Sequence, residues 1–163
     1  MHESHIDASL SKPQLYAELA SELRALIEGE PDQIANMANA AALIYHSLPQ
    51  LNWAGFYLLK GGELVVGPFQ GKPACVRIAM GKGVCGTAAA QRKSVIVQDV
   101  NQFPGHIACD AASNSEIVTP LIRGNELIGV LDLDSPDLAR FDEQDRAGLE
   151  QLVKILMASS PAR

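Results

Sequence analysis

The stretch NWAGFYLLKGGELVV, residues 52–66, decides the fold class. Aromatic and aliphatic residues alternate with their neighbours from Asn52 to about Leu59, which is typical of a strand. The glycines of Lys60-Gly61-Gly62 then suit the positive φ angles of a tight hairpin turn. Because a second apolar run begins at Leu64, we expect the chain to return and to start an antiparallel sheet.

Helical patterns stand on both sides of this strand-rich region. Apolar residues recur every three to four positions from Ser11 to Glu28, from Pro31 to just before Pro49, and from about Asp142 to Met157. Between them we expect strands at Val76–Ile78, Val95–Val97, Glu116–Ile122 and Leu127–Asp134, and a short helix from about Val84. This order predicts an α+β fold, an antiparallel sheet flanked by N-terminal and C-terminal helices.

Two connections stand out between these elements. Residues Gly67 to Pro73 are rich in Gly and Pro, and we expect them to form a crossing after the hairpin. Residues Asp99 to Asn114 predict a long loop, and loops of this length inside compact domains are usually functional or disordered. We interpret this second loop as a functional one.

Length and composition limit the possible functions. The chain has 163 residues, 47% of them hydrophobic and 20% charged, which suits a single globular domain over residues 1–163. The net charge of −6 and the lack of a basic stripe with interleaved aromatics argue against nucleic acid. No apolar run approaches the ~20 residues of a membrane span. We therefore expect a cytoplasmic protein that is not bound to a membrane.

The cysteines are Cys75, Cys85 and Cys109. Their spacing matches neither a C-x-x-C pair nor a zinc ribbon, so we expect no metal. Cys109 lies in GHIACDAASNSEIVTP, residues 105–120, which is too polar for a core. A thiol becomes reactive when it is exposed and has thiolate character. Cys109 is therefore the candidate nucleophile, and an inert buried thiol is the alternative.

Carboxylates gather near this cysteine. In LIGVLDLDSP, residues 127–136, strand alternation places Ile128, Val130, Asp132 and Asp134 on one face and Leu127, Gly129, Leu131 and Leu133 on the other. Two like charges beside apolar neighbours are costly unless they bind a cation or ligand, or share a proton. Glu116 follows Cys109 by only seven residues and can join them. The alternative is an ordinary surface pair at the end of a strand.

A possible slot lies between two aromatic residues. Trp53, Gly55 and Tyr57 share one strand face, so the aromatics flank a position without a side chain. Such a slot can receive a methyl group, a thioether or an ammonium group. The alternative is a packed aromatic face with Gly55 at a bend.

These groups suit the reduction of a sulfoxide. The Cys109 thiolate would attack the sulfur while a carboxylic acid protonates the departing oxygen. The resulting sulfenic acid condenses with a second thiol, and either Cys75 or Cys85 could provide it. His106 precedes Cys109 by three residues, but in a loop this spacing does not establish a dyad. We expect His106 to hold the loop.

Four motifs resemble the free methionine-(R)-sulfoxide reductases, a family of GAF-domain enzymes. They are LNWAGFYLL (51–59), GKPACVRIAMGKGVCGTAAAQ (71–91), QDVNQFPGHIACDAASNSEIVTPL (98–121) and GVLDLDSPDLARFD (129–142). The opening residues 15–45 are similar as well, so the resemblance covers nearly the whole chain.

The resemblance implies a GAF-like fold and a role for each site residue. Cys109 would be the nucleophile and Cys75 the resolving thiol, whereas Cys85 would pack nearby or act as an additional thiol. Asp134 is the expected proton donor. The substrate-binding residues would be Trp53, Tyr57, Glu116, Asp132 and Asp134.

The resemblance also implies partners. The substrate would be free methionine-(R)-sulfoxide, thioredoxin would reopen the disulfide, no cofactor would be needed, and the chain would form a homodimer. The strongest alternative is a non-catalytic GAF-type sensor of a small ligand or of redox state, because a fold does not fix a function. A metal site built from Cys109, His106 and the acids is a weaker one.

Overall fold

A computed structural model describes residues 6–7, 9–107, 109 and 111–159. Six strands form an antiparallel sheet in the order β3-β2-β1-β6-β5-β4. The strands are β1 (Trp53–Lys60), β2 (Glu63–Gly71), β3 (Arg77–Ala79), β4 (Val95–Val97), β5 (Ser115–Arg123) and β6 (Glu126–Ser135). The helices are α1 (Lys12–Ile27), α2 (Gln33–Ser47), α3 (Gly83–Gln91), the 3₁₀ turn η1 (Val100–Gln102) and α4 (Glu143–Ala158). The expected α+β class is confirmed.

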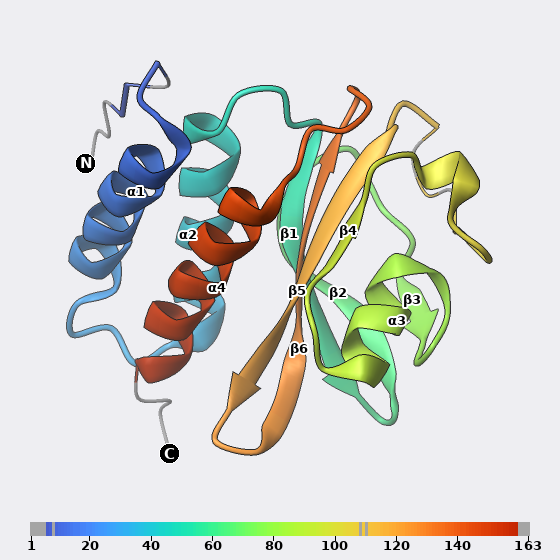
Figure 1. The fold of residues 1–163 in the computed structure, drawn as a ribbon. Coiled ribbons are helices and arrows are strands. Elements are labelled where there is room, and N and C mark those ends of the chain that lie inside the picture. Colours follow the sequence, from blue (N-terminus) through green and yellow to red (C-terminus); the bar gives the residue numbers. More distant parts are fainter. Residues whose placement is uncertain (1–5, 8, 108, 110, 160–163) are drawn as a thin grey trace.

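The helices divide between the two faces of the sheet (Figure 1). Helices α1, α2 and α4 cover one face, whereas α3 and η1 lie on the other. Strand β1 is buried from Trp53 to Leu58 because both faces are covered. A site can therefore form between the sheet and α3, on the face opposite to the one covered by α1, α2 and α4.

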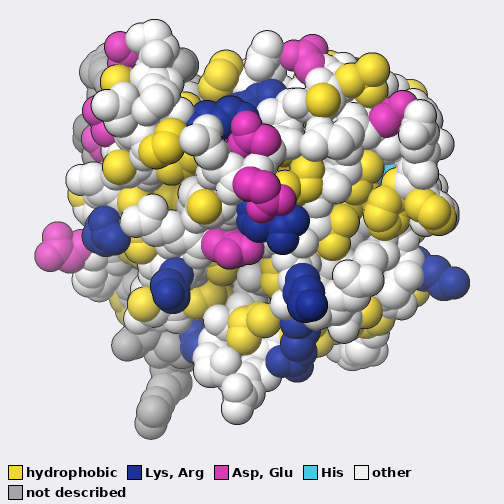
Figure 2. Space-filling view, in the orientation of Figure 1, with side chains coloured by type: hydrophobic (Ala, Val, Ile, Leu, Met, Phe, Trp, Pro, Cys, Tyr) yellow, Lys and Arg dark blue, Asp and Glu magenta, His cyan; other side chains and the backbone are white. Residues whose placement is uncertain are grey.

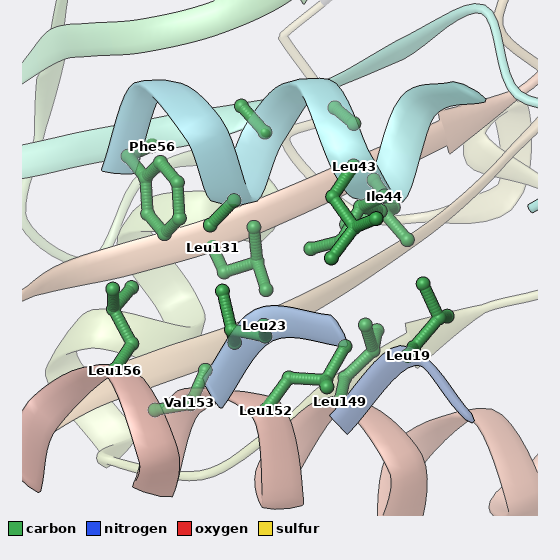
Figure 3. Packing of buried hydrophobic residues seen from close by; sticks show 14 of the residues in the cluster. Leu19, Leu23, Leu43, Ile44, Phe56, Leu131, Leu149, Leu152, Val153 and Leu156 are labelled. Carbon is green, nitrogen blue, oxygen red and sulfur yellow. The ribbon is translucent and has the colours of Figure 1, made fainter. Parts of the chain in front are cut away.

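The main core lies between the sheet and the α1, α2, α4 layer. Figure 3 shows the aliphatic side chains of these helices meeting Phe56 of β1 and Leu131 of β6. The helices begin where the sequence predicts, because Ser11, Asp32 and Asp142 each accept a hydrogen bond from a first-turn backbone N–H. The α1, α2, α4 layer therefore buries one face of the sheet in the main core.

Strand β2 is longer than the sequence predicted. The expected crossing from Gly67 to Pro73 instead continues the strand through Gly71, with Phe69 opposite Gly55. A register shift between Gly55 and Tyr57 absorbs the irregular Gly-Pro sequence, so pairing resumes beyond it. The prediction of a crossing was wrong because the bulge is not visible in the pattern.

Strand β6 shows a second irregularity. The pairing of β6 with β5 shifts its register between Leu121 and Ile122, which lie opposite Gly129 and Leu127. Leu127 packs in the core on the α3 side of the sheet, whereas Ile128 packs against the core on the α1, α2, α4 side. The predicted faces are therefore wrong for Leu127 and Ile128. They hold for Leu131, Leu133 and the two aspartates beyond.

Charged groups of both signs lie on the molecular surface. Figure 2 shows Lys and Arg side chains next to Asp and Glu side chains on one face. None of the described helices is long and apolar enough to cross a membrane.

Candidate functional site

Three carboxyl groups meet on one face of the sheet. Asp134 of β6 pairs with Trp53 of β1 on one side and with Glu116 of β5 on the other. Asp132 lies two residues earlier on the same face, opposite Gly55. The antiparallel register therefore builds the acidic cluster that the sequence pattern predicted.

Glu116 and Asp132 are almost fully buried, at 6% and 5% exposure. Burial raises the pKa of Glu116 well above its usual value, and the nearby charge of Asp132 raises it further. Burial likewise raises the pKa of Asp132, and Asp134 adds to the effect. A raised pKa favours the protonated form of a carboxyl group, and a protonated carboxyl group can donate a hydrogen bond.

Cys85 completes the buried cluster from the other side. It lies in the first turn of α3, which packs over the sheet, and it is hydrogen-bonded to Asp132. Burial raises the pKa of its thiol well above the usual value, and the charge of Asp132 adds to the effect. Burial therefore favours the neutral thiol of Cys85 over its thiolate.

Cys75 and Cys109 form a disulfide that closes this side of the site. Their Cα atoms lie 5.5 Å apart, although the two cysteines are separated by 34 positions in the sequence. Cys85 remains the free thiol among the described residues. The chain therefore joins its two candidate redox cysteines, one in the loop between β2 and β3 and the other in the loop between η1 and β5.

A pocket links the acids to the disulfide. Every predicted site residue except Cys75 lines it, and Cys75 is bonded to Cys109, which does. The pocket lies between the sheet, the N-terminal turn of α3 and the loop that carries Cys109. The predicted cysteines, aromatic residues and acids are thus brought to one place.

The two aromatic residues fix the segment that leads to Cys75. Trp53 Nε1 donates a hydrogen bond to the carbonyl of Lys72 at 3.1 Å, and the Tyr57 hydroxyl donates to the carbonyl of Cys75 at 2.9 Å. The rings of Trp53 and Tyr57 are stacked with their centroids 5.9 Å apart. Their polar atoms therefore hold a cysteine loop while their ring faces remain in the pocket wall.

The predicted slot at Gly55 is filled by protein. A Cβ atom at Gly55 would lie 2.2 Å from the Cβ atom of Phe69 and 2.7 Å from its Cα atom. The Phe69 ring also stacks on Trp53, with centroids 5.2 Å apart. The alternative interpretation, a packed aromatic face with Gly55 at an irregular strand position, is the one that the structure supports.

Several lining residues were not predicted from the sequence. They are Lys72, Pro73 and Ala74 before the first cysteine, Ile78, Gly83 and Val84 around the start of α3, and Ile107 and Ser113 in the long loop. Ser113 accepts a hydrogen bond from the side-chain amide of Asn52 at 3.1 Å, which joins the loop to the start of β1. These residues carry no catalytic signature, so only their place in the fold reveals them.

His106 also lines the pocket. Its backbone N–H bonds to the carbonyl of Phe103, and burial lowers the pKa of its imidazole, which favours the neutral form. This contact comes from the backbone, so the role of His106 in holding the loop stays a prediction. Its side chain additionally forms part of the wall, which the sequence reasoning did not expect.

Comparisons with known proteins agree with the fold. The GAF domain family matches residues 24–157. The chain is 58% identical over 147 residues to Protein YtsP of Bacillus subtilis, covering 89% of this chain and 90% of that protein. It is 55% identical over 144 residues to the free methionine-R-sulfoxide reductase of Escherichia coli, covering 88% and 87% of the two chains.

A solved structure with the same arrangement is the free methionine-R-sulfoxide reductase of Neisseria meningitidis in complex with its substrate. It matches with a TM-score of 0.92 and 46% sequence identity, over 96% of this chain and 94% of that chain. The architecture of this chain thus has counterparts in relatives that match most of its length.

Proposed function

Because this chain belongs to the GAF-domain family of free methionine-(R)-sulfoxide reductases, we propose that it reduces free methionine-(R)-sulfoxide to methionine. The observation that carries the proposal is the placement of a disulfide-forming Cys109 in the same pocket as a cluster of acids in which burial raises the pKa of Glu116 and of Asp132. A thiol supplies the electrons for such a reduction, and an acid supplies the proton for the oxygen that leaves the substrate.

The first step consumes the sulfoxide. The Cys109 thiolate attacks the electrophilic sulfur of the substrate while an acid of the pocket protonates the sulfoxide oxygen. The oxygen passes to Cys109 as a sulfenic acid, and methionine leaves with its sulfur reduced. We assign the proton to Asp134, with Glu116 and Asp132 holding the oxygen and the amino group through hydrogen bonds.

The second step regenerates the enzyme. The Cys75 thiol attacks the sulfenic sulfur, a disulfide forms, and the sulfenic oxygen leaves as water. The disulfide between Cys75 and Cys109, which leaves Cys85 as a buried free thiol of the same pocket, supports Cys75 as the resolving thiol. An external dithiol then reduces the disulfide and is itself oxidised.

We assign this last reaction to thioredoxin in the cytoplasm, where thiols are kept reduced. Two apolar side chains next to the redox cysteines support an approach from this side: Val76 is 59% exposed and Ile107 is 38% exposed. A reductant with an apolar rim around its own thiols could rest on them.

We further propose that residues 1–163 act as one domain and that two copies associate as a homodimer, which sedimentation velocity would test.

A coupled assay tests the proposed activity. With thioredoxin, its reductase and NADPH, the protein should consume NADPH on addition of free methionine-(R)-sulfoxide, and not with the S form or a peptide-bound sulfoxide. The variant Cys109→Ser should be inactive. Cys75→Ser should release one methionine per chain and then stop, whereas steady turnover in that variant would move the resolving role to Cys85.

The GAF-type sensor remains the rival function, and the same assay decides between them. A sensor would bind the sulfoxide or change its redox state without producing methionine. Absence of methionine from the wild-type reaction, with the disulfide shown to be reduced beforehand, would favour the sensor.

A further inference from the structure

Cys85, Glu116 and Asp132 form a buried three-donor cluster that the proposed reduction uses only in part. One ligand atom from each side chain lies within 4.8 Å of the other two. The three residues come from α3, β5 and β6, so three separate elements of the fold fix their positions. Such a cluster is already assembled before any ligand arrives.

One oxygen of this cluster has no partner. Asp132 Oδ1 is buried and lacks a hydrogen-bond partner among the residues that the structure describes. An unpaired buried carboxylate oxygen is costly, because it has lost its water and gained nothing in return. Since Asp132 lines the pocket, a ligand there can satisfy this oxygen.

We propose that Cys85, Glu116 and Asp132 form a binding site for a divalent cation of the zinc class. A thiolate sulfur with two carboxylate oxygens suits Zn²⁺, which accepts sulfur and oxygen ligands together, whereas Mg²⁺ and Ca²⁺ take oxygen ligands. The site supplies three protein ligands and faces the pocket, so a water molecule completes the tetrahedron. Zinc–ligand bonds of about 2.0–2.3 Å place the donor atoms of a tetrahedral site about 3.6 Å apart, which is compatible with donor atoms that all lie within 4.8 Å of one another.

Charge also favours a cation here. Cys85, Glu116, Asp132 and the adjacent Asp134 would carry like charges when ionised, and burial penalises each charge. A divalent ion replaces the protons that otherwise neutralise these groups. Binding releases those protons to solvent and leaves the oxidation state of every sulfur unchanged.

The bound ion would inhibit the reductase. This consequence, unlike the binding itself, rests on the proposed function, because Glu116 and Asp132 are the residues that we assign to the substrate. An ion on these carboxylates removes the hydrogen-bond donors that would hold the sulfoxide. Zinc and the sulfoxide should therefore exclude one another.

The disulfide form allows a clean test of binding. With Cys75 and Cys109 oxidised, Cys85 is the free thiol of the chain, so any sulfur ligation reports on Cys85 alone. Addition of Co²⁺ should produce a sulfur-to-cobalt charge-transfer absorption at one ion per chain, and Zn²⁺ should displace the cobalt and abolish the band.

Two variants locate the ligands. Cys85→Ala should lose the charge-transfer band and bind Zn²⁺ at least about 100-fold more weakly, because even indirect supports of metal ligands are worth 10- to 100-fold. Glu116→Gln, which nearly preserves the side-chain shape, should weaken binding while the fold is kept. The matched control is Asp137→Asn, which removes an exposed carboxylate outside the pocket and should bind Zn²⁺ as the wild type does.

The result that would overturn the proposal is a wild-type chain without the band, or a Cys85→Ala chain that binds zinc unchanged. Competition then separates the two proposals. In the Cys75→Ser/Cys109→Ser double variant, free methionine sulfoxide should raise the apparent Kd for Zn²⁺. If zinc binds while the sulfoxide neither binds nor competes, the inhibition and the proposed function fail, and the metal site stands.

Discussion

Glu116 is the residue whose surroundings most clearly depart from those of an ordinary carboxylate. It is buried beside Asp132 and Asp134. Burial and the charge of Asp132 raise the pKa of Glu116, so folding favours its protonated form. Neutral carboxyl groups donate hydrogen bonds to an oxygen, which is what a sulfoxide needs in order to lose that oxygen. The burial of one side chain is therefore tied to the chemistry of the pocket.

This burial predicts how stability varies with pH. The pKa of Glu116 lies well above 4.5 in the folded chain, so the folded chain keeps a proton that the unfolded chain loses. The free energy of unfolding should therefore fall as the pH rises from about 4.3 towards the raised pKa. Glu116→Gln should lose less stability than the wild type between about pH 5 and pH 8 in urea unfolding.

The exposed Glu18 provides the control for this measurement. Glu18→Gln removes a carboxyl group from the surface of α1 and should keep the pH dependence of the wild type. An equally steep loss of stability in Glu116→Gln would show that Glu116 is ionised in the folded chain.

The proton donor is tested at Asp134. An amide can donate a hydrogen bond but cannot supply a proton, so Asp134→Asn should slow the reduction by about 10²- to 10⁴-fold. The rate is measured as methionine formed in a single turnover. Asp137→Asn, an exposed change three positions further along the chain, should leave the rate unchanged. A full rate in Asp134→Asn would assign the proton to another group.

At the scale of single residues, the sequence could predict which polar side chains belong to the site, but not which side chains pack against them. Cys109, Glu116 and the two aspartates could be predicted because strand alternation and a polar loop constrain where such groups lie. The contact of Cys85 with Asp132 could not, since it depends on how α3 is laid over the sheet. Long-range packing of this kind leaves no local pattern.

The hairpin of β1 and β2 is the element that shapes the pocket wall. A register shift near Gly55 lets Phe69 approach the backbone of β1 and stack on Trp53. The turn at Gly61 and Gly62, with positive φ at both residues, confirms the predicted hairpin. The bulge beyond it was not predictable, because Gly and Pro in 67–73 suggest a loop as readily as an irregular strand.

Gly55 should therefore be intolerant of any side chain. In Gly55→Ala the new Cβ would overlap the Cα and Cβ atoms of Phe69, which cannot move without the β2 backbone. We expect a loss of at least about 3 kcal/mol in the free energy of unfolding, at the upper end of overpacking effects. Chemical denaturation of the two proteins measures the difference.

Gly67→Ala is the matched control on the neighbouring strand. There the nearest atoms are side-chain carbons of Leu58 at 3.2 Å and 3.3 Å, which can shift by rotation. This variant should be clearly more stable than Gly55→Ala. Equal stability of the two would mean that the approach of Phe69 is not tight.

Over the whole molecule, the disulfide joins the loop between β2 and β3 to the loop between η1 and β5. The link spans 34 positions and so restricts the unfolded chain considerably. Closing a loop of this size is worth up to about 4 kcal/mol. The oxidised protein should therefore unfold at higher urea concentration than the reduced protein.

Cys75→Ser gives the control for this comparison. It cannot form the disulfide, so reductant should leave its unfolding midpoint unchanged. If the wild type also unfolded at the same urea concentration with and without reductant, the two loops would not be linked in solution.

The arrangement of layers was predictable because helical and strand periodicities are local signals. The joining of Cys75 to Cys109 was expected only through the resemblance, since the residues alone left Cys75 and Cys85 as alternatives. The choice between them depends on which thiol faces the long loop, and that is a property of the assembled fold.

The most direct test of the account is the fate of the thiols after one turnover. Reduced protein is mixed with an equal amount of free methionine-(R)-sulfoxide, alkylated and analysed by peptide mass spectrometry. We predict one methionine per chain, a peptide pair joined through Cys75 and Cys109, and an alkylated Cys85. Formation of methionine with both Cys75 and Cys109 still alkylated as free thiols would contradict the account.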